Sequence, residues 1–121
     1  MNNRQAVLVV DDDTSLRTML SLSLRRAGYP TLTAASGREA LALLATRPVG
    51  FMVTDGRMDL MDGFELSRRA KSLRPELHIA MVSAVFLASD AAGTPIERVF
   101  EKPVAVAGLV EWMQDIAGLI P

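Results

Sequence analysis

The sequence predicts an α/β fold in which helices cover both faces of a parallel β-sheet. Short apolar runs alternate along the chain with longer stretches of helical period, which is typical of successive βαβ units. Most of the short runs are apolar on successive residues, as strands covered by helices on both faces require. A length of 121 residues suffices for one such domain and is too short for two ordinary ones.

The composition is that of a globular protein. Half of the residues are apolar, 22% are charged and the net charge is -1, which excludes a disordered chain and indicates neither a nucleic-acid-binding nor a membrane-binding surface. Without cysteine, neither disulfides nor thiolate metal sites can form. Residues 1–6 read Met-Asn-Asn-Arg-Gln-Ala and lead into only about five apolar residues before an acidic cluster, too few for a membrane span and unlike a signal peptide. We therefore expect a cytoplasmic protein.

Five strands can be placed in the apolar runs, of which the second is weak and the fifth is short. They are expected at residues 6–10, 31–34, 50–54, 77–82 and 97–101. No internal repeat and no linker divides the chain, so one domain is expected.

Helices are predicted between these strands. Thr14 or Ser15 is expected to cap the first helix and Gly28 to end it. Ser36 and Glu39 form a capping box that opens the second helix.

Three further segments complete the helical pattern. Residues 63–73 and 104–119 are predicted as the third and the last helix. Residues 84–93 have no clear apolar stripe, so only a short or irregular fourth helix is expected there. Trp112 in the last helix is either a core residue or a partner contact.

Polar residues gather after the predicted strands. Aspartates 11–13 follow the first strand, Asp55 the third, Ser83 the fourth and Lys102 the fifth. In an open parallel sheet the ligand site lies at the carboxyl ends of the strands, so these side chains are expected to converge. Clustered carboxylates need a cation, and an all-oxygen set suits Mg2+. A metal beside a free carboxylate and a lysine is equipped for phosphoryl transfer.

Four segments then define a resemblance that runs over essentially the whole chain. They read Val-Leu-Val-Val-Asp-Asp-Asp at 7–13, Val-Thr-Asp-Gly-Arg-Met-Asp-Leu-Met-Asp-Gly at 53–63, Met-Val-Ser-Ala at 81–84 and Phe-Glu-Lys-Pro at 100–103. In this order and spacing they resemble the response-regulator receiver family of two-component systems. The resemblance implies that residues 1–121 form one receiver domain with a flavodoxin-like, doubly wound sheet of five parallel strands in the order 2-1-3-4-5.

The resemblance also implies a role for each residue at the strand ends. Asp55 would be the phospho-acceptor, with Ser83 hydrogen-bonding one phosphoryl oxygen and Lys102 pairing with another. A cis peptide bond is expected before Pro103.

The implied metal ligands surround the acceptor. Asp12, the Asp55 carboxylate and the Arg57 backbone carbonyl would bind Mg2+ directly, and Asp11 would act largely through water. Asp13 is expected to be structural or peripheral.

The implied function is that of a signalling switch rather than an enzyme. The phosphoryl donor would be a phospho-histidine on a sensor histidine kinase or a histidine phosphotransfer protein, and the domain would promote its own phosphorylation and dephosphorylation. The output would pass to an effector domain or protein, with no direct contact to nucleic acid or membrane. The sequence also leaves open that the domain forms a weak homodimer.

Two departures from the family pattern concern the output. Asp59 stands where a proline is usual, which is expected to soften the loop and add a carboxylate near the metal. Val99 stands where an aromatic residue usually rotates on activation, and Phe100 beside it is expected to point to the other sheet face. These departures leave open a receiver that acts without phosphorylation, through protein contacts alone.

The acidic segments also allow two other interpretations. Residues 11–15 are similar to the nucleophile motif of haloacid-dehalogenase-type phosphatases, which need Thr or Val where Ser15 stands and usually a longer chain. A Mg2+-dependent phosphatase acting through Asp11 stays as the enzyme alternative. A calcium-binding EF-hand at 55–63 is excluded by Arg57 and by Leu60, which stands where the loop needs glycine.

Overall fold

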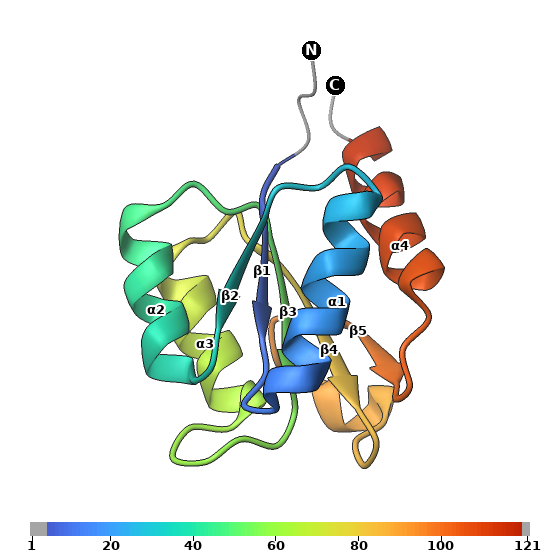
Figure 1. Cartoon of the computed structure of the whole chain (residues 1–121). Coiled ribbons are helices and arrows are strands. Elements are labelled where there is room, and N and C mark those ends of the chain that lie inside the picture. Colours follow the sequence, from blue (N-terminus) through green and yellow to red (C-terminus); the bar gives the residue numbers. More distant parts are fainter. Residues whose placement is uncertain (1–4, 120–121) are drawn as a thin grey trace.

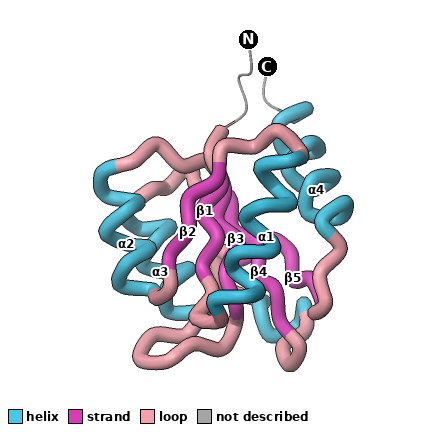
Figure 2. The backbone as a smooth tube through the Cα atoms, in the orientation of Figure 1, coloured by secondary structure: helices cyan, strands magenta, loops and turns pink. Residues whose placement is uncertain are grey.

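The computed structural model describes residues 5–119 and confirms the predicted α/β fold with a central parallel sheet (Figures 1 and 2). The strand order is β2-β1-β3-β4-β5, as the family resemblance implied. Residues 1–4, on which much of the expectation about a signal peptide depends, lie outside the described part. The strands are β1 (Val7–Val10), β2 (Thr31–Ala34), β3 (Phe51–Asp55), β4 (His78–Ser83) and β5 (Ile96–Glu101).

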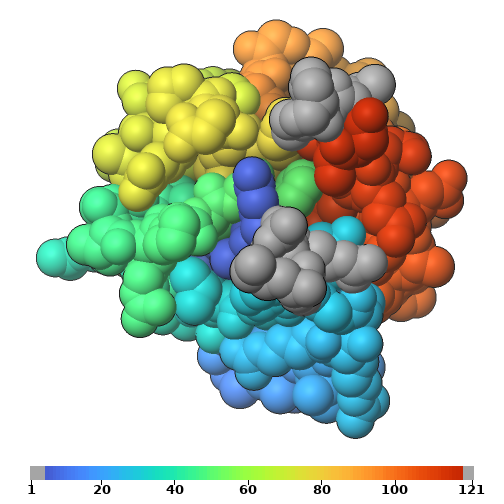
Figure 3. All heavy atoms as spheres, turned by 90° about the horizontal axis from the view of Figure 1, so that it is seen from above, coloured from blue at the N-terminus to red at the C-terminus, as the bar shows by residue number. Residues whose placement is uncertain are grey.

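Two pairs of helices cover the two faces of the sheet. Helices α1 (Thr14–Arg26) and α4 (Val106–Leu119) lie on one face, and α2 (Gly37–Thr46) and α3 (Gly63–Leu73) lie on the other. Figure 3 views the end at which the strands begin, with the two pairs on either side. None of the helices in the described range is long and apolar enough to cross a membrane.

Strand β1 shows why its sequence is apolar throughout. Val7 and Val9 pack in the core under α1 and α4, whereas Leu8 and Val10 pack in the core under α2 and α3. All four are buried, and burying one such side chain contributes about 1.5–3 kcal/mol. A polar residue at any of them would therefore face one of the two cores.

Trp112 is a core residue. Its side chain is only 4% exposed, and its ring lies edge-on to that of Phe51 with the centroids 5.6 Å apart. The Phe100 prediction is also confirmed, because Phe100 packs against this core, whereas Val99 packs against the core of the other face.

The helix starts differ from the predicted ones at two places. The cap of α1 is Asp13 rather than Thr14 or Ser15, because its carboxylate accepts the Leu16 N–H at 3.0 Å. Helix α4 begins at Val106, two residues after the predicted start, where the Gly108 N–H bonds to the Ala105 carbonyl.

The capping box of α2 forms in a modified way. The Ser36 hydroxyl accepts the Glu39 N–H at 3.1 Å, as predicted. The Glu39 carboxylate accepts the N–H of Ala35 at 3.3 Å rather than that of the cap residue.

The segment between β4 and β5 contains no α-helix. It forms only the 3-10 helix η1 (Ala88–Ala91), of which Ala91 alone is buried. Too few apolar side chains face the sheet here to hold a full helix against it, which confirms the expected short or irregular element.

Candidate functional site

An acidic cluster lies at the carboxyl ends of the two central strands. Asp11 follows β1, and Asp55 is the last residue of the neighbouring β3. One carboxylate oxygen from each of Asp11, Asp12 and Asp55 lies within 4.8 Å of the other two, and we call these three residues the acidic rim. The strand order reverses between β1 and β3, so the rim occupies the place where this type of sheet binds ligands.

The donor set of the acidic rim fits a hard divalent cation. All three ligand groups are carboxylates, and neither histidine nor cysteine is present in the cluster. Oxygen ligands of this kind suit Mg2+, which is held in proteins by one or two carboxylates together with water and phosphate oxygens. Asp12 is exposed and Asp55 half-buried, so the cluster is open to solvent on the side where a ligand would enter.

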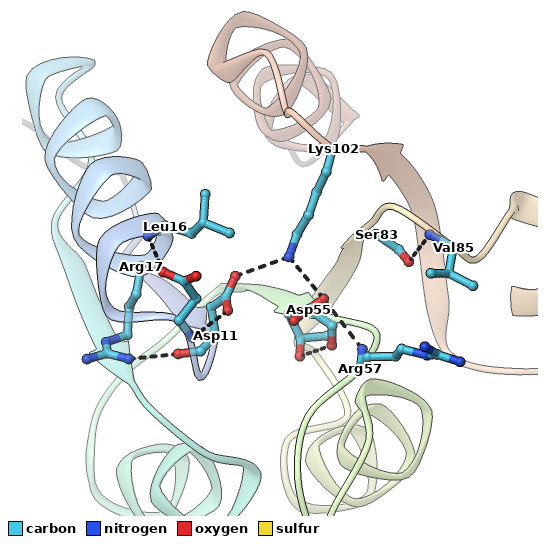
Figure 4. Close-up of polar contacts among 10 residues, drawn as sticks. Asp11, Leu16, Arg17, Asp55, Arg57, Ser83, Val85 and Lys102 are labelled. Atoms are coloured by element: carbon cyan, nitrogen blue, oxygen red, sulfur yellow. Dashed lines mark hydrogen bonds and ion pairs between the residues drawn. The ribbon is translucent and has the colours of Figure 1, made fainter.

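Lys102 reaches between two of these carboxylates (Figure 4). Its ammonium nitrogen lies 3.3 Å from Asp55 Oδ1 and 3.5 Å from Asp11 Oδ2. Lys102 follows β5, where its N–H bonds to the Ser83 carbonyl at 3.0 Å and its peptide bond to Pro103 is cis, as expected. A cation therefore stands beside the predicted acceptor carboxylate.

Burial and neighbouring charges set the protonation of this pair. Burial raises the pKa of Asp11, and the charge of Asp55 raises it further, whereas the Asp13 N–H and Lys102 offset part of the effect. Burial by itself lowers the pKa of Lys102, but the charges of Asp11 and Asp55 more than compensate, so its pKa is raised. Lys102 therefore stays cationic at neutral pH.

The Asp11 pKa gives a prediction on pH dependence. We expect Asp11 in the metal-free protein to titrate above the ordinary value of 3.8, and closer to it in Asp55→Asn because one raising charge is gone. The folded state holds this proton more tightly than the unfolded state, so the contribution of Asp11 to the free energy of unfolding falls as pH rises from 3.8 through the folded pKa. Carboxyl carbon NMR titration measures both values, and a pKa at or below 3.8 in the wild type would contradict the expected burial effect.

Ser83 lies at the end of β4 but its hydroxyl is engaged elsewhere. The buried Ser83 Oγ accepts the N–H groups of Val85 at 3.0 Å and Phe86 at 2.9 Å. These bonds hold the start of the β4–η1 loop, and the Phe86 ring in turn lies edge-on to Phe64 with the centroids 4.8 Å apart. Of the predicted site residues, Ser83 is therefore the one whose side-chain bonds point away from the acidic rim.

The loop after the acceptor, residues 56–62, is closed by glycine. The Gly63 N–H bonds to the Gly56 carbonyl at 3.0 Å, and a Cβ on Gly63 would lie 2.3 Å from the Asp55 carbonyl oxygen. At the tip of the loop, the fully exposed Leu60 has a φ of 70°, which a branched side chain adopts only under strain. Asp59 is not one of the three carboxylates that make up the acidic rim.

Arg57 contacts the acceptor through its backbone. Its N–H donates to Asp55 Oδ1 at 3.4 Å. The exposed side chain points away from Asp11 and Lys102 in Figure 4, and no ion pair with Asp59 forms in the described part of the chain.

Two residues that the sequence did not assign to the site support it from α1. The Asp13 N–H donates to Asp11 Oδ1 at 2.9 Å, and the Arg17 guanidinium donates to the Asp11 backbone carbonyl at 2.8 Å. A weak signal for Arg17 lies in its place near the N-terminal end of a helix, where a cation is unfavourable to the helix dipole.

An apolar pocket of about 350 Å³ adjoins the rim between α1 and the start of α4. Asp55 and Lys102 form part of its wall. The rest of the pocket wall includes Leu16, Met19, Leu20, Val104 and Val106. Of these, Leu16 and Met19 are exposed to solvent.

The fold and the acidic rim together are those of a doubly wound α/β domain with a carboxylate cluster at its ligand edge, and comparison with known proteins identifies the family. The profile of the response regulator receiver domain matches residues 7–114. The chain belongs to this family and is a receiver domain of two-component signalling.

Known proteins of similar sequence include one of matching length. The chain is 34% identical over 113 residues to the response regulator receiver protein CpdR of Brucella abortus (strain 2308), an alignment that covers 91% of this chain and 94% of CpdR. It is 34% identical over 112 residues to the transcriptional regulatory protein GlrR of Escherichia coli (strain K12), covering 90% of this chain but only 25% of GlrR. The chain thus spans a quarter of the length of GlrR.

The solved structures agree. A response regulator receiver protein from Pseudomonas putida superimposes with a TM-score of 0.83 at 30% sequence identity, over 95% of this chain and 99% of that one.

Proposed function

We propose that this receiver domain is a phosphorylation switch in which Asp55 accepts a phosphoryl group from a phospho-histidine, with Mg2+ as cofactor. The observation that carries the proposal is the position of Lys102, whose ammonium lies 3.3 Å from Asp55 Oδ1 beside three carboxylates able to hold a metal. A structural ion pair would not need Asp12 and Asp11 converging on the same point.

In the proposed transfer, a carboxylate oxygen of Asp55 attacks phosphorus. The bond from phosphorus to the histidine nitrogen breaks, and the electron pair leaves with the imidazole. Lys102 is placed to pair with a phosphoryl oxygen as negative charge gathers there, because it already contacts the attacking carboxylate. Ser83 would donate its hydroxyl to another phosphoryl oxygen after turning from its present bonds to the loop.

We assign Asp11, Asp12, the Asp55 carboxylate and the Arg57 backbone carbonyl to the Mg2+ site, with Asp11 acting largely through water. When bound, the ion supplies positive charge to the phosphoryl oxygens. Water later hydrolyses the acyl phosphate, which releases inorganic phosphate and restores the free Asp55 carboxylate, so we propose a switch that resets itself.

The proposed partner is a histidine kinase or a histidine phosphotransfer protein. The apolar pocket beside Asp55 and the exposed Leu16 and Met19 would receive apolar side chains of the donor, which brings its phospho-histidine to the rim. The output would pass to an effector domain or protein, since GlrR is a transcriptional regulatory protein of which this chain matches a quarter. We place the protein in the cytoplasm, where such kinases act.

The direct test is incubation of the full chain with acetyl phosphate. Intact mass spectrometry is expected to show one added phosphoryl group with Mg2+ and none when the metal is removed with a chelator. Beryllium fluoride with Mg2+ should occupy the same site. Equal phosphorylation with and without the metal would refute the cofactor assignment.

Arg57 is expected to affect the lifetime of the phosphoryl group. Its side chain is free to lie over the phosphorylated carboxylate, so Arg57→Ala should change the dephosphorylation rate several-fold, on the scale of about 1 kcal/mol for one positioned charge. Loss of the acyl phosphate over time measures this rate. Arg38→Ala, which removes an exposed charge on α2, is the control; a rate unchanged in Arg57→Ala would exclude the side chain from the reaction.

The response to phosphorylation is expected in the loop of residues 56–63 rather than on the face formed by η1, β5 and α4. Val99 offers no ring that could turn inward, and η1 is a single short turn. Backbone amide shifts measured with and without beryllium fluoride should therefore be largest in this loop. Shifts centred on residues 84–101 and the last helix, with little change in residues 56–63, would contradict this route.

A further inference from the structure

We propose that Arg17 is a positioning residue of the metal site, which holds the β1–α1 turn so that Asp11 and Asp12 face Asp55. The inference rests on the proposed function in so far as the ion is Mg2+. Arg17 touches neither the acceptor nor the space between the carboxylates; it acts through the backbone of Asp11.

The contact joins two elements. Arg17 lies one turn into α1, and its Nη1 donates to the backbone carbonyl of Asp11, the residue after β1, at 2.8 Å. A hydrogen bond of this length from a charged donor is among the stronger ones in proteins. The side chain is half-buried, so solvent competes only in part for the bond. The Asp11 carbonyl is thereby fixed away from the acidic rim, as Figure 4 shows.

Asp13 completes the same turn. Its carboxylate accepts the Leu16 N–H and caps α1, while its own N–H donates to Asp11 Oδ1 at 2.9 Å. With Oδ1 held in this way, Asp11 Oδ2 is the oxygen that faces Lys102, at 3.5 Å. The turn is therefore held at the Asp11 carbonyl, at the Asp11 carboxylate and at the helix cap.

The charges explain why such restraint is needed. Asp11, Asp12 and Asp55 repel one another, and of these three carboxylates the Lys102 ammonium pairs with those of Asp11 and Asp55. Before an ion binds, this repulsion favours a turn in which the carboxylates move apart. Arg17 opposes that movement at the carbonyl that joins Asp11 to Asp12, so the ligands stay close enough to receive the ion.

Helix α1 itself supplies a matched control. Arg25, near the other end of the helix, donates its Nη2 to the backbone carbonyl of Thr31 at 2.9 Å. Arg25→Ala removes the same kind of bond, from a guanidinium to a backbone carbonyl at the end of a strand. That carbonyl belongs to the first residue of β2, far from the acidic rim. Its effect on stability should match that of Arg17→Ala.

The experiment compares the metal affinity of the full-length wild type, Arg17→Ala, Arg17→Lys and Arg25→Ala by calorimetric titration with Mg2+, with no phosphoryl donor present. We expect Arg17→Ala to bind Mg2+ about tenfold more weakly, as is usual when a residue that orients metal ligands is removed. Arg17→Lys, which keeps one cationic donor, should recover part of the affinity, and Arg25→Ala should bind like the wild type. The midpoint temperature of thermal unfolding should fall by the same amount in Arg17→Ala and in Arg25→Ala.

A second measurement needs no metal. Amide hydrogen exchange at Asp13 in the metal-free protein should accelerate in Arg17→Ala and not in Arg25→Ala, because the turn is released only in the first. Wild-type Mg2+ affinity in Arg17→Ala, or an equal loss in Arg25→Ala, overturns the inference. If the wild type itself binds no Mg2+, the cofactor proposal fails, and exchange at Asp13 then decides whether Arg17 restrains the turn.

Discussion

Asp55→Asn is expected to abolish the phosphoryl adduct that acetyl phosphate forms with the wild type. An amide oxygen is a poor nucleophile, and the ion pair of 3.3 Å to Lys102 loses its anion. Intact mass spectrometry after incubation with Mg2+ measures the adduct, and circular dichroism checks that the variant is folded. The substitution keeps the shape of the side chain, so the fold should be retained.

Asp11→Asn distinguishes the switch from the phosphatase alternative. If the domain is a switch, Asp11→Asn should bind Mg2+ more weakly and become phosphorylated more slowly. The phosphoryl group that it accepts should still be carried on Asp55. In a phosphatase that uses Asp11 as its nucleophile, the covalent intermediate disappears in Asp11→Asn. An undiminished adduct on Asp55→Asn together with its loss from Asp11→Asn would assign the chemistry to Asp11.

Lys102→Ala is expected to lower the phosphorylation rate by about a hundredfold, the usual effect of removing one group that stabilises charge in the transition state. Mg2+ affinity should be nearly intact, because Lys102 is not a ligand and its positive charge opposes the ion. Calorimetry and the rate of adduct formation measure the two effects separately.

Lys71 provides the control for this variant. It is also a partly buried lysine, but its ammonium donates to the Leu77 backbone carbonyl at 2.7 Å at the other end of the sheet. Lys71→Ala should leave both quantities unchanged. An equal loss of metal affinity and phosphorylation in Lys102→Ala would contradict the separate roles of cation and metal site.

The strands could be predicted from the sequence because their two-sided burial leaves a plain pattern. All five strands lie within one residue of the predicted bounds, and the pattern is plainest in β1, β3 and β4, which are buried almost throughout, whereas the edge strands β2 and β5 are only partly buried. The same argument brought Asp11, Asp55 and Lys102 to one edge, because parallel strands end together. The order of the strands along the chain and the residues at their carboxyl ends were sufficient to predict that these three side chains converge.

Side-chain direction was not predictable in the same way. Ser83 was placed at the right strand end, yet nothing in its neighbourhood in the sequence indicates that its hydroxyl accepts the Val85 and Phe86 N–H groups. Likewise, the choice between Asp13 and Thr14 as helix cap depends on one backbone rotation, since both residue types cap helices well. The exposed Leu60 at positive φ reflects loop closure, which a pattern of residue types does not encode.

The most direct test of the central claim is to locate the phosphoryl group in the wild type. Sodium borohydride reduces an aspartyl phosphate to homoserine, and peptide mass mapping then identifies the modified residue. After acetyl phosphate and Mg2+, homoserine is expected at position 55 and at none of positions 11–13. Homoserine at position 11, or no homoserine while the intact protein carries a phosphoryl group, would show that Asp55 is not the acceptor.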